Sequence, residues 1–253
     1  MLKTLGIVQA CCHSRQFCCR AARKLGGRSV LEWVIRHVTD SLRLDGVIVL
    51  VCDEADHRFM RNLVPADVPI FVGTKSDSLG RFSQSLEQYG SQAVVRVRGD
   101  YLFIDPALID RLVTTADEHQ QCDYVSYCSR DGQPAILSSV GIYAEWIRSN
   151  ALHKAARHAK HPEERENVTK YIYSHPEKFN IRLIPAPSEI DRDDVRLTLE
   201  MEEDWDNVLT IYEALGPEKM DWRRITHLLD QHPALRNRMA ALNRDRDTLH
   251  ANW

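Results

Sequence analysis

The sequence has no long hydrophobic run and little excess of either charge. Its longest apolar stretch covers residues 47–52, whereas a membrane-spanning helix needs about 20 apolar residues. The first nine residues turn polar too early for a secretory signal peptide. Lys and Arg total 33 against 36 Asp and Glu, a net charge of -3, so bulk charge does not indicate nucleic-acid binding. We therefore expect a cytoplasmic protein whose partners include neither a membrane nor a nucleic acid.

Cysteine is present, but in no pattern typical of a redox or zinc site. The seven cysteines include two adjacent pairs, Cys11-Cys12 and Cys18-Cys19, and no Cys-x-x-Cys occurs. Adjacent cysteines rarely both ligate one ion, and cytosolic thiols stay reduced. We therefore expect seven free thiols, no disulfide and no zinc.

Short apolar runs alternate with amphipathic segments through the first half of the 253 residues. Strands are predicted at residues 5–8, 47–51, 70–72, 93–97 and 124–127, with helices from 29, at 78–89 and from 106. Ser29 and Asp105 have the positions of helix N-caps. This order predicts a mainly parallel sheet with helices on both faces.

The pattern changes after residue 130. Strands are predicted at 139–143, 181–184 and 195–198, helices at 144–159 and 163–174, and a mainly helical chain from 202. The interpretation is an α/β domain over residues 1–215 and a helical C-terminal tail over 216–253.

Ligands of open α/β sheets bind beyond the carboxyl ends of the strands. The loop after the first predicted strand carries five cations, Arg15, Arg20, Arg23, Lys24 and Arg28. A basic loop that opens onto a helix suits a phosphate chain. A solvated basic loop remains the alternative from composition alone.

Two carboxylates also follow predicted strands. Asp100 comes directly after Gly99, and Glu200 ends the stretch that begins at residue 196. Carboxylate oxygens together with substrate phosphates are ligands that Mg²⁺ takes. Each residue could instead cap the element that follows it, and spacing alone does not pair residues 100 positions apart.

Four stretches, at residues 73–82, 95–106, 164–173 and 196–200, carry a resemblance to a known family. The first reads Gly-Thr-Lys-Ser-Asp-Ser-Leu-Gly-Arg-Phe, and the second contains Arg-Val-Arg-Gly-Asp and then Ile-Asp-Pro. The third begins Glu-Arg-Glu-Asn-Val-Thr, and the fourth is Arg-Leu-Thr-Leu-Glu. Taken in order, they resemble the cytidylyltransferase-like family of the spore coat polysaccharide biosynthesis protein SpsF.

The resemblance implies a three-layer nucleotide-diphospho-sugar transferase (GT-A-like) fold that binds CTP and a sugar acceptor, with a homodimer as a possible assembly. It implies Mg²⁺ held by Asp100 and Glu200, and phosphates clamped by Arg15 and Arg20. The nucleotide-binding residues that it implies are Gln9, Ala10, Ser14, Asp77, Arg81 and Arg96. Those implied for the acceptor are Glu166, Asn167 and Thr169.

The chain departs from the family in the first loop and at two other positions. Cys11 and Gln16 stand where the family has arginines, and Arg20 stands for a lysine. Asn167 replaces a histidine, and Glu200 replaces an aspartate. Losing one charged contact to a phosphate commonly costs roughly 2–4 kcal/mol of transition-state stabilisation.

We therefore expect a nucleotidyltransferase, specifically a cytidylyltransferase, that activates a sugar or acidic sugar for surface polysaccharide or glycan biosynthesis. One alternative is a catalytically impaired nucleotide- or sugar-binding module of the same fold, which the altered first loop favours. Another is a glycosyltransferase, which would use an Asp-x-Asp metal motif such as Asp191-Arg192-Asp193.

Overall fold

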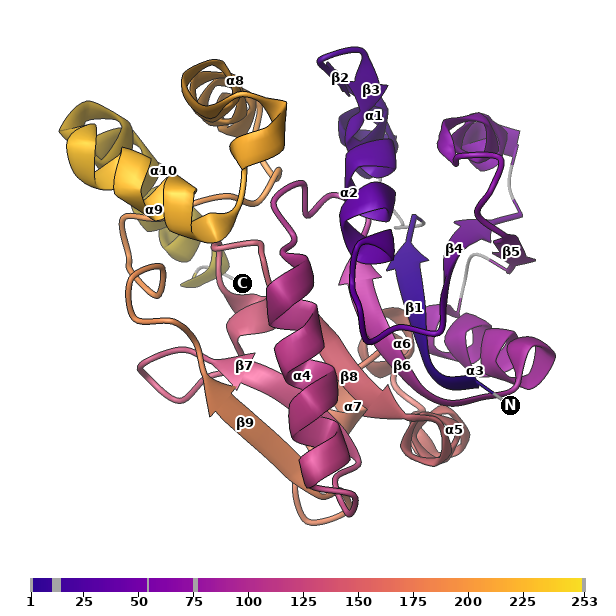
Figure 1. Cartoon of the computed structure of the whole chain (residues 1–253). Helices are drawn as coiled ribbons and strands as arrows, with labels where there is room; N and C mark the ends of the chain where they lie inside the picture. The colour runs from indigo at the N-terminus through magenta and orange to yellow at the C-terminus, as the bar shows by residue number, and fades with distance from the viewer. Residues whose placement is uncertain (1, 11–14, 54, 75–76, 252–253) are drawn as a thin grey trace.

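A seven-stranded sheet runs through the centre of the molecule (Figure 1). The computed structural model describes residues 2–10, 15–53, 55–74 and 77–251, without the side chains of 15–18, 55–58 and 246–251. The strand order is β5-β4-β1-β6-β8-β7-β9. The bounds are β1 Leu2–Gln9, β4 Gly46–Cys52, β5 Ile70–Gly73, β6 Ser91–Arg98, β7 Tyr124–Cys128, β8 Glu145–Arg148 and β9 Ile181–Pro185. Only β8 pairs antiparallel in this sheet, with β6 and β7, so the predicted mainly parallel α/β fold is confirmed.

Helices cover both faces of the sheet and bury two apolar cores. On one face lie α2 (Val30–Thr39), α4 (Pro106–Glu118), α8 (Glu203–Leu215), α9 (Trp222–Gln231) and α10 (Pro233–Ala251). On the other lie α3 (Ser78–Tyr89), α5 (Ser149–His158) and α7 (Lys170–Tyr173). Successive strand residues point to opposite faces, so Val8 joins the first core and Ile7 the second.

Smaller elements surround the carboxyl ends of the parallel strands and the loops beside them. They are α1 (Arg15–Ala22), the two-stranded β2 (Lys24–Leu25) and β3 (Arg28–Ser29), and α6 (Pro162–Glu166). Three 3-10 turns complete the described chain: η1 (Ala55–Leu63), η2 (Ala135–Leu137) and η3 (Pro217–Lys219).

The two predicted helix caps are confirmed. The Ser29 hydroxyl accepts a hydrogen bond from the Glu32 N–H at the start of α2. The Asp105 carboxylate accepts from the N–H groups of Ala107 and Leu108, and Pro106 opens α4. Such caps satisfy N–H groups that the first helical turn leaves without partners.

Two of the predicted strands are wrong. Residues 139–143 and 195–198 belong to no strand of the structure. The two segments meet where the N–H groups of Leu197 and Thr198 both donate to the Ser139 carbonyl, at 3.0 and 3.2 Å. One shared acceptor does not make the repeated pairing of a ladder.

Gly141 explains why the first of these segments does not continue as a strand. Its φ is +69°, and a Cβ there would lie 2.8 Å from the backbone nitrogen of Thr198. Only glycine combines this left-handed backbone with so close an approach. The chain turns at this point and enters β8 at Glu145, so the helix predicted from residue 144 begins at Ser149.

The helical segments after residue 202 pack on the first core. Ile211 of α8, Ile225 and Leu229 of α9 and Met239 of α10 are all buried in the cluster that contains Val8. These helices therefore help to hold the sheet that they cover. None of the helices in the described chain is long and apolar enough to cross a bilayer.

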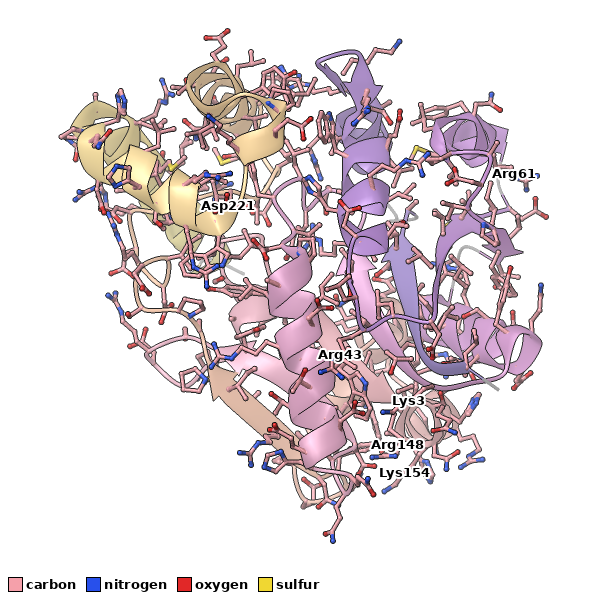
Figure 2. The ribbon with its side chains drawn as sticks, viewed as in Figure 1. Lys3, Arg43, Arg61, Arg148, Lys154 and Asp221 are labelled. Atoms are coloured by element: carbon pink, nitrogen blue, oxygen red, sulfur yellow. The ribbon has the colours of Figure 1, made fainter. Side chains whose placement is uncertain are left out.

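Charged side chains at the amino end of the parallel strands serve the fold. Figure 2 labels Lys3, Arg148 and Lys154 toward this end of the molecule. Lys3 pairs with Asp117 at 2.9 Å, and the Arg148 Nε donates to the Cys122 carbonyl at 2.9 Å. The site must therefore be sought at the opposite end, where the strand-end motifs lie.

Candidate active site

Gly99 brings the end of β6 close to the end of β1. Its N–H donates to the Gln9 carbonyl at 3.0 Å, and a Cβ at position 99 would lie 3.0 Å from that same oxygen. Asp100 follows directly, and its side chain is 1% exposed. This close contact between the ends of β1 and β6 places the Asp100 carboxylate at the carboxyl edge of the sheet, where it is shielded from water.

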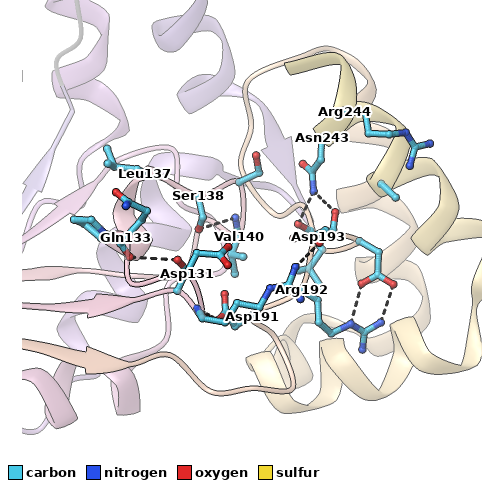
Figure 3. A pocket seen from close by; sticks show the side chains of 17 residues that line it. Asp131, Gln133, Leu137, Ser138, Val140, Asp191, Arg192, Asp193, Asn243 and Arg244 are labelled. Atoms are coloured by element: carbon cyan, nitrogen blue, oxygen red, sulfur yellow. Dashed lines mark hydrogen bonds and ion pairs between the residues drawn. The ribbon is translucent and has the colours of Figure 1, made fainter. Parts of the chain in front are cut away.

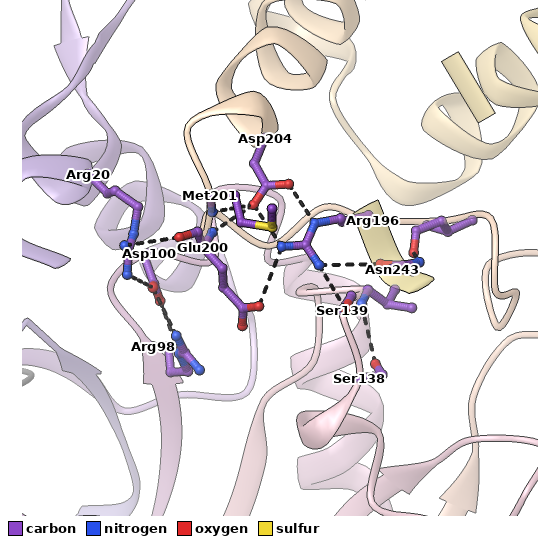
Figure 4. Close-up of polar contacts among 12 residues, drawn as sticks. Arg20, Arg98, Asp100, Ser138, Ser139, Arg196, Glu200, Met201, Asp204 and Asn243 are labelled. Atoms are coloured by element: carbon purple, nitrogen blue, oxygen red, sulfur yellow. Dashed lines mark hydrogen bonds and ion pairs between the residues drawn. The ribbon is translucent and has the colours of Figure 1, made fainter. Parts of the chain in front are cut away.

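Two arginines accompany the Asp100 carboxylate (Figure 4). Arg98 donates to both of its oxygens, from Nε at 3.1 Å and from Nη2 at 2.9 Å. Arg20 of α1 places its Nη2 3.9 Å from Oδ2. A buried carboxylate needs such partners because desolvation disfavours an isolated charge.

Arg20 also links this carboxylate to the segment that carries Glu200. Its Nη1 donates to the Glu200 carbonyl at 3.4 Å, and its Nε is buried without a hydrogen-bond partner among the described residues. The structure therefore brings together three residues expected at the site, Arg20, Asp100 and Glu200.

A buried arginine fixes the Glu200 segment. Arg196, whose side chain is fully buried, binds both Asp204 oxygens at 2.6 and 3.0 Å and lies 3.5 Å from the Glu200 carboxylate. One Asp204 oxygen also accepts from the N–H groups of Glu200 and Met201, each at 2.8 Å. Together these bonds set both the backbone and the side chain at position 200.

Arg196 reaches outward from the site as well. Its Nη1 donates to Ser139 Oγ at 3.3 Å and to Asn243 Oδ1 at 3.4 Å. Asn243 lies on α10, and its amide donates to the carbonyls of Asp193 and Val195. Sequence reasoning missed Asp204 and Asn243. For Asp204 a signal was available, because acidic residues such as those in the first turn of α8 are typical of the start of a helix.

Gln9 and Arg96 belong to a second network on the α3 face of the sheet. Arg96 donates to the Gln9 side-chain oxygen at 3.0 Å and forms an ion pair with buried Glu145. Glu145 also accepts from the Tyr124 hydroxyl. Burial, with the Glu145 charge second, raises the pKa of Tyr124 well above its usual value, so that hydroxyl stays a donor. Ala10 is buried beside Gln9, and its N–H donates to the Leu50 carbonyl.

Asp77 and Arg81 make polar contacts at the start of α3. Asp77 caps the helix by accepting from the Gly80 N–H at 2.8 Å, and it forms an ion pair with Arg165. Arg81 is 1% exposed, donates to Ser78 Oγ at 3.0 Å and binds the Thr74 carbonyl. The contacts described for the Asp77 and Arg81 side chains are all with other residues of the protein.

The residues expected at the acceptor lie from the last residue of α6 to the residue before α7. Glu166 and Asn167 are exposed, and Thr169 is 3% exposed. The Asn167 amide donates to the Glu163 carbonyl at 3.1 Å. Because Arg165 binds Asp77, this segment is tied to the start of α3 on the same face as Arg96.

Several expectations fall outside the described residues. They are those for Ser14, Cys11 and the side chains of Arg15 and Gln16. The expectation that all thiols are free is wrong for Cys52, which is disulfide-bonded at the end of β4. Among the described cysteines, Cys19, Cys122 and Cys128 are free.

A separate cleft of about 720 Å³ lies between the turn after β7, residues 191–195 and α10 (Figure 3). It contains the Asp191-Arg192-Asp193 motif. The Asp191 carboxylate accepts from the Arg130 N–H at 2.5 Å, and Asp193 forms an ion pair with the Arg130 side chain. The motif therefore anchors the turn at Arg130, which argues against the glycosyltransferase alternative.

A mainly parallel α/β sheet with a buried carboxylate at its carboxyl edge is an arrangement typical of nucleotidyltransferases. The cytidylyltransferase family model matches residues 5–240, so the chain belongs to that family.

Two curated relatives extend over nearly the whole chain. An uncharacterized protein of Methanocaldococcus jannaschii is 30% identical over 93% of this chain and 94% of its own length. The spore coat polysaccharide biosynthesis protein SpsF of Bacillus subtilis is 26% identical over 90% of this chain and 95% of its own.

Solved structures share the fold. A cytidylyltransferase from Leptospira borgpetersenii superposes with a TM-score of 0.82 at 20% identity, covering 93% of this chain and 97% of that one. The CMP:2-keto-3-deoxy-manno-octonic acid synthetase complexed with CTP gives 0.62 at 10% identity, covering 84% and 99%. A manganese complex of a Mycobacterium tuberculosis protein gives 0.56 at 16% identity, covering 82% and 98%.

Proposed function

We propose that this protein transfers the CMP group of CTP to a sugar hydroxyl. The hydroxyl oxygen attacks the α-phosphorus and gives up its proton to solvent, the bond from the α-phosphorus to the bridging oxygen of the β-phosphate breaks, and pyrophosphate leaves. The observation that carries the proposal is the buried Asp100 carboxylate, which a cytidylyltransferase-family chain places beside Arg20 at the carboxyl end of β6. The CTP complex of the octonic acid synthetase and the role of SpsF in spore coat polysaccharide support CTP and a sugar as substrates.

The donor set suits Mg²⁺ or Mn²⁺. Asp100 and Glu200 offer hard carboxylate oxygens, which these ions prefer, and Arg20 contacts both segments. Asp100 and Glu200 would hold the ion, which when bound neutralises phosphate charge and orients the phosphate chain.

The chain's own residues supply positioning and positive charge, and phosphoryl transfer of this kind needs no protein nucleophile. Arg20 and Arg15 would bind the phosphates. The exposed Glu166 and Asn167 would meet the acceptor. The proposal places the reaction in the cytoplasm, and a homodimer remains a prediction.

The test is calorimetric CTP binding with Mg²⁺, followed by a pyrophosphate-release assay with a panel of neutral and acidic sugars. Asp100→Asn should abolish metal-dependent CTP binding while the thermal unfolding transition persists. Asp206→Asn, an exposed carboxylate on α8, is the matched control and should bind CTP like the wild type. Unchanged metal-dependent affinity in Asp100→Asn would refute the assigned role.

The altered first loop supports a second candidate function, a catalytically impaired nucleotide- or sugar-binding module of the same fold. Cys11 and Gln16 stand at two positions where the family has arginines, so two positive charges are missing from this loop. Tight CTP binding without pyrophosphate release for any sugar tested would favour the module over the enzyme.

A further inference from the structure

The Asp100 carboxylate is already neutralised within the protein. Arg98 grips both oxygens, and its guanidinium also lies 4.9 Å from the Tyr101 ring centroid, so it is held on two sides. A carboxylate has about four acceptor positions, so Arg98 leaves room for a further partner. Arg20 lies near Oδ2 and adds a second positive charge there.

Arg20 is held less firmly than Arg98. Its contacts are long, 3.9 Å to Asp100 and 3.4 Å to the Glu200 carbonyl, and its buried Nε has no hydrogen-bond partner among the described residues. A guanidinium with an unused donor gains hydrogen bonds when a phosphate comes within reach, because its fork matches phosphate oxygens.

A bare divalent cation would meet two positive charges at Asp100. To use the free side of the carboxylate it must displace Arg20, which then has to leave a mostly buried position without a new anion. A nucleotide-bound cation brings that anion, since the phosphates can receive Arg20 as the cation takes its place.

We propose that Arg20 is an exchange residue that makes the site accept a divalent cation only as the nucleotide chelate. In the free protein Arg20 neutralises Asp100, and on binding it moves to the phosphates while the cation meets the carboxylate. This inference rests on the proposed function, and it names the metal-nucleotide complex as the substrate form.

The experiment counts free Mn²⁺ by electron paramagnetic resonance, which needs no turnover. Mn²⁺ is titrated into the wild type, Arg20→Gln and Arg36→Gln, each with and without CTP. Arg36 is the matched control because it lies on α2 and forms its ion pair with Asp67 instead of Asp100. Circular dichroism melts verify that all variants fold.

Without CTP, Arg20→Gln should bind Mn²⁺ about tenfold more tightly than the wild type, equivalent to about 1.4 kcal/mol. With CTP it should bind the Mn²⁺ complex at least tenfold more weakly, because the phosphate contact is lost. Arg36→Gln should change neither affinity by more than about twofold, and Arg20→Lys, which keeps the charge, should bind free Mn²⁺ as weakly as the wild type.

The titrations without CTP distinguish a failure of the Arg20 exchange from a failure of the proposed function. Wild type that binds free Mn²⁺ as tightly as Arg20→Gln overturns the exchange, even if both bind CTP. Equal changes of both affinities in Arg36→Gln overturn it too, since removing any positive charge would then have the same effect. Absence of CTP binding in every variant, with or without Mn²⁺, refutes the proposed function and the exchange together.

Discussion

Replacing Asp204 with alanine tests how firmly the Glu200 segment is held. The carboxylate is 1% exposed and accepts four hydrogen bonds, two from Arg196 and two from backbone N–H groups. Asp204→Ala leaves the Arg196 charge buried, and breaking a buried pair from one side costs about 3–5 kcal/mol. Arg196 keeps weaker contacts to Glu200 and Ser139, so we expect the lower end, about 3 kcal/mol.

In a chain of this size that loss lowers Tm by about 6–12 °C, at about 2–4 °C per kcal/mol. Urea unfolding followed by circular dichroism measures the free energy, with Asp206→Ala as the exposed control on the same helix. We expect the control to change stability by less than about 0.5 kcal/mol.

A double-mutant cycle separates the ion pair from other effects of the substitution. Arg196→Met combined with Asp204→Ala removes both charges, so the double variant should be more stable than the sum of the single losses predicts. Single losses that add, or a loss below about 1 kcal/mol in Asp204→Ala, would show that the pair does not hold this segment.

Three further changes probe the turn, the first loop and an acidic group. Gly141→Ala should lower the free energy of unfolding more than Gly132→Ala, since both have positive φ but only the first meets backbone; urea melts that rank them equally would contradict the close approach. Cys11→Arg with Gln16→Arg should tighten calorimetric CTP affinity at least tenfold, because each restored contact is worth roughly 1.5–3 kcal/mol; weaker binding would mean a different phosphate site. Two arginines lower the pKa of Asp194, so its stabilisation is complete above its unfolded pKa and is lost as pH falls through the folded one. Urea melts of Asp194→Asn should therefore differ from the wild type near pH 6 and converge with it in strong acid; a constant difference would contradict this.

The sheet was predictable where apolar runs are continuous. Residues 47–51 are apolar on both faces because β4 is buried by helices on both sides, and residues 93–97 of β6 are apolar apart from Arg96. The missed strand β8 is short, carries Glu145 and Arg148, and follows a glycine turn. Its pairing with β6 and β7 depends on contacts far along the chain, which periodicity does not encode.

The site was predictable only in outline. Strand-end position pointed to Asp100, because parallel strands deliver their carboxyl ends to one edge. The strand predicted before Glu200 does not form, and contacts with Arg20, Arg196 and Asp204 place that residue instead. The grip of Arg98 on Asp100 and of Asp204 on Arg196 depends on side-chain direction and burial. For Arg81 and Arg96 the resemblance implied nucleotide contacts, which stay a prediction; the structure adds contacts of both side chains with the protein itself.

The hydrogen bond between Arg196 and Asn243 joins a middle segment to the last helix, 47 positions later in the chain. At about 5–20 residues per second, a ribosome needs about 2–9 s to add that stretch. During this interval the emerging chain has its sheet strands but lacks Asn243. The side-chain amide of Asn243 accepts from Arg196 and donates to the carbonyls of Asp193 and Val195. The edge that carries Glu200 is thus completed last during synthesis, and nascent chains shorter than 243 residues should be the forms that proteases cut within residues 191–204.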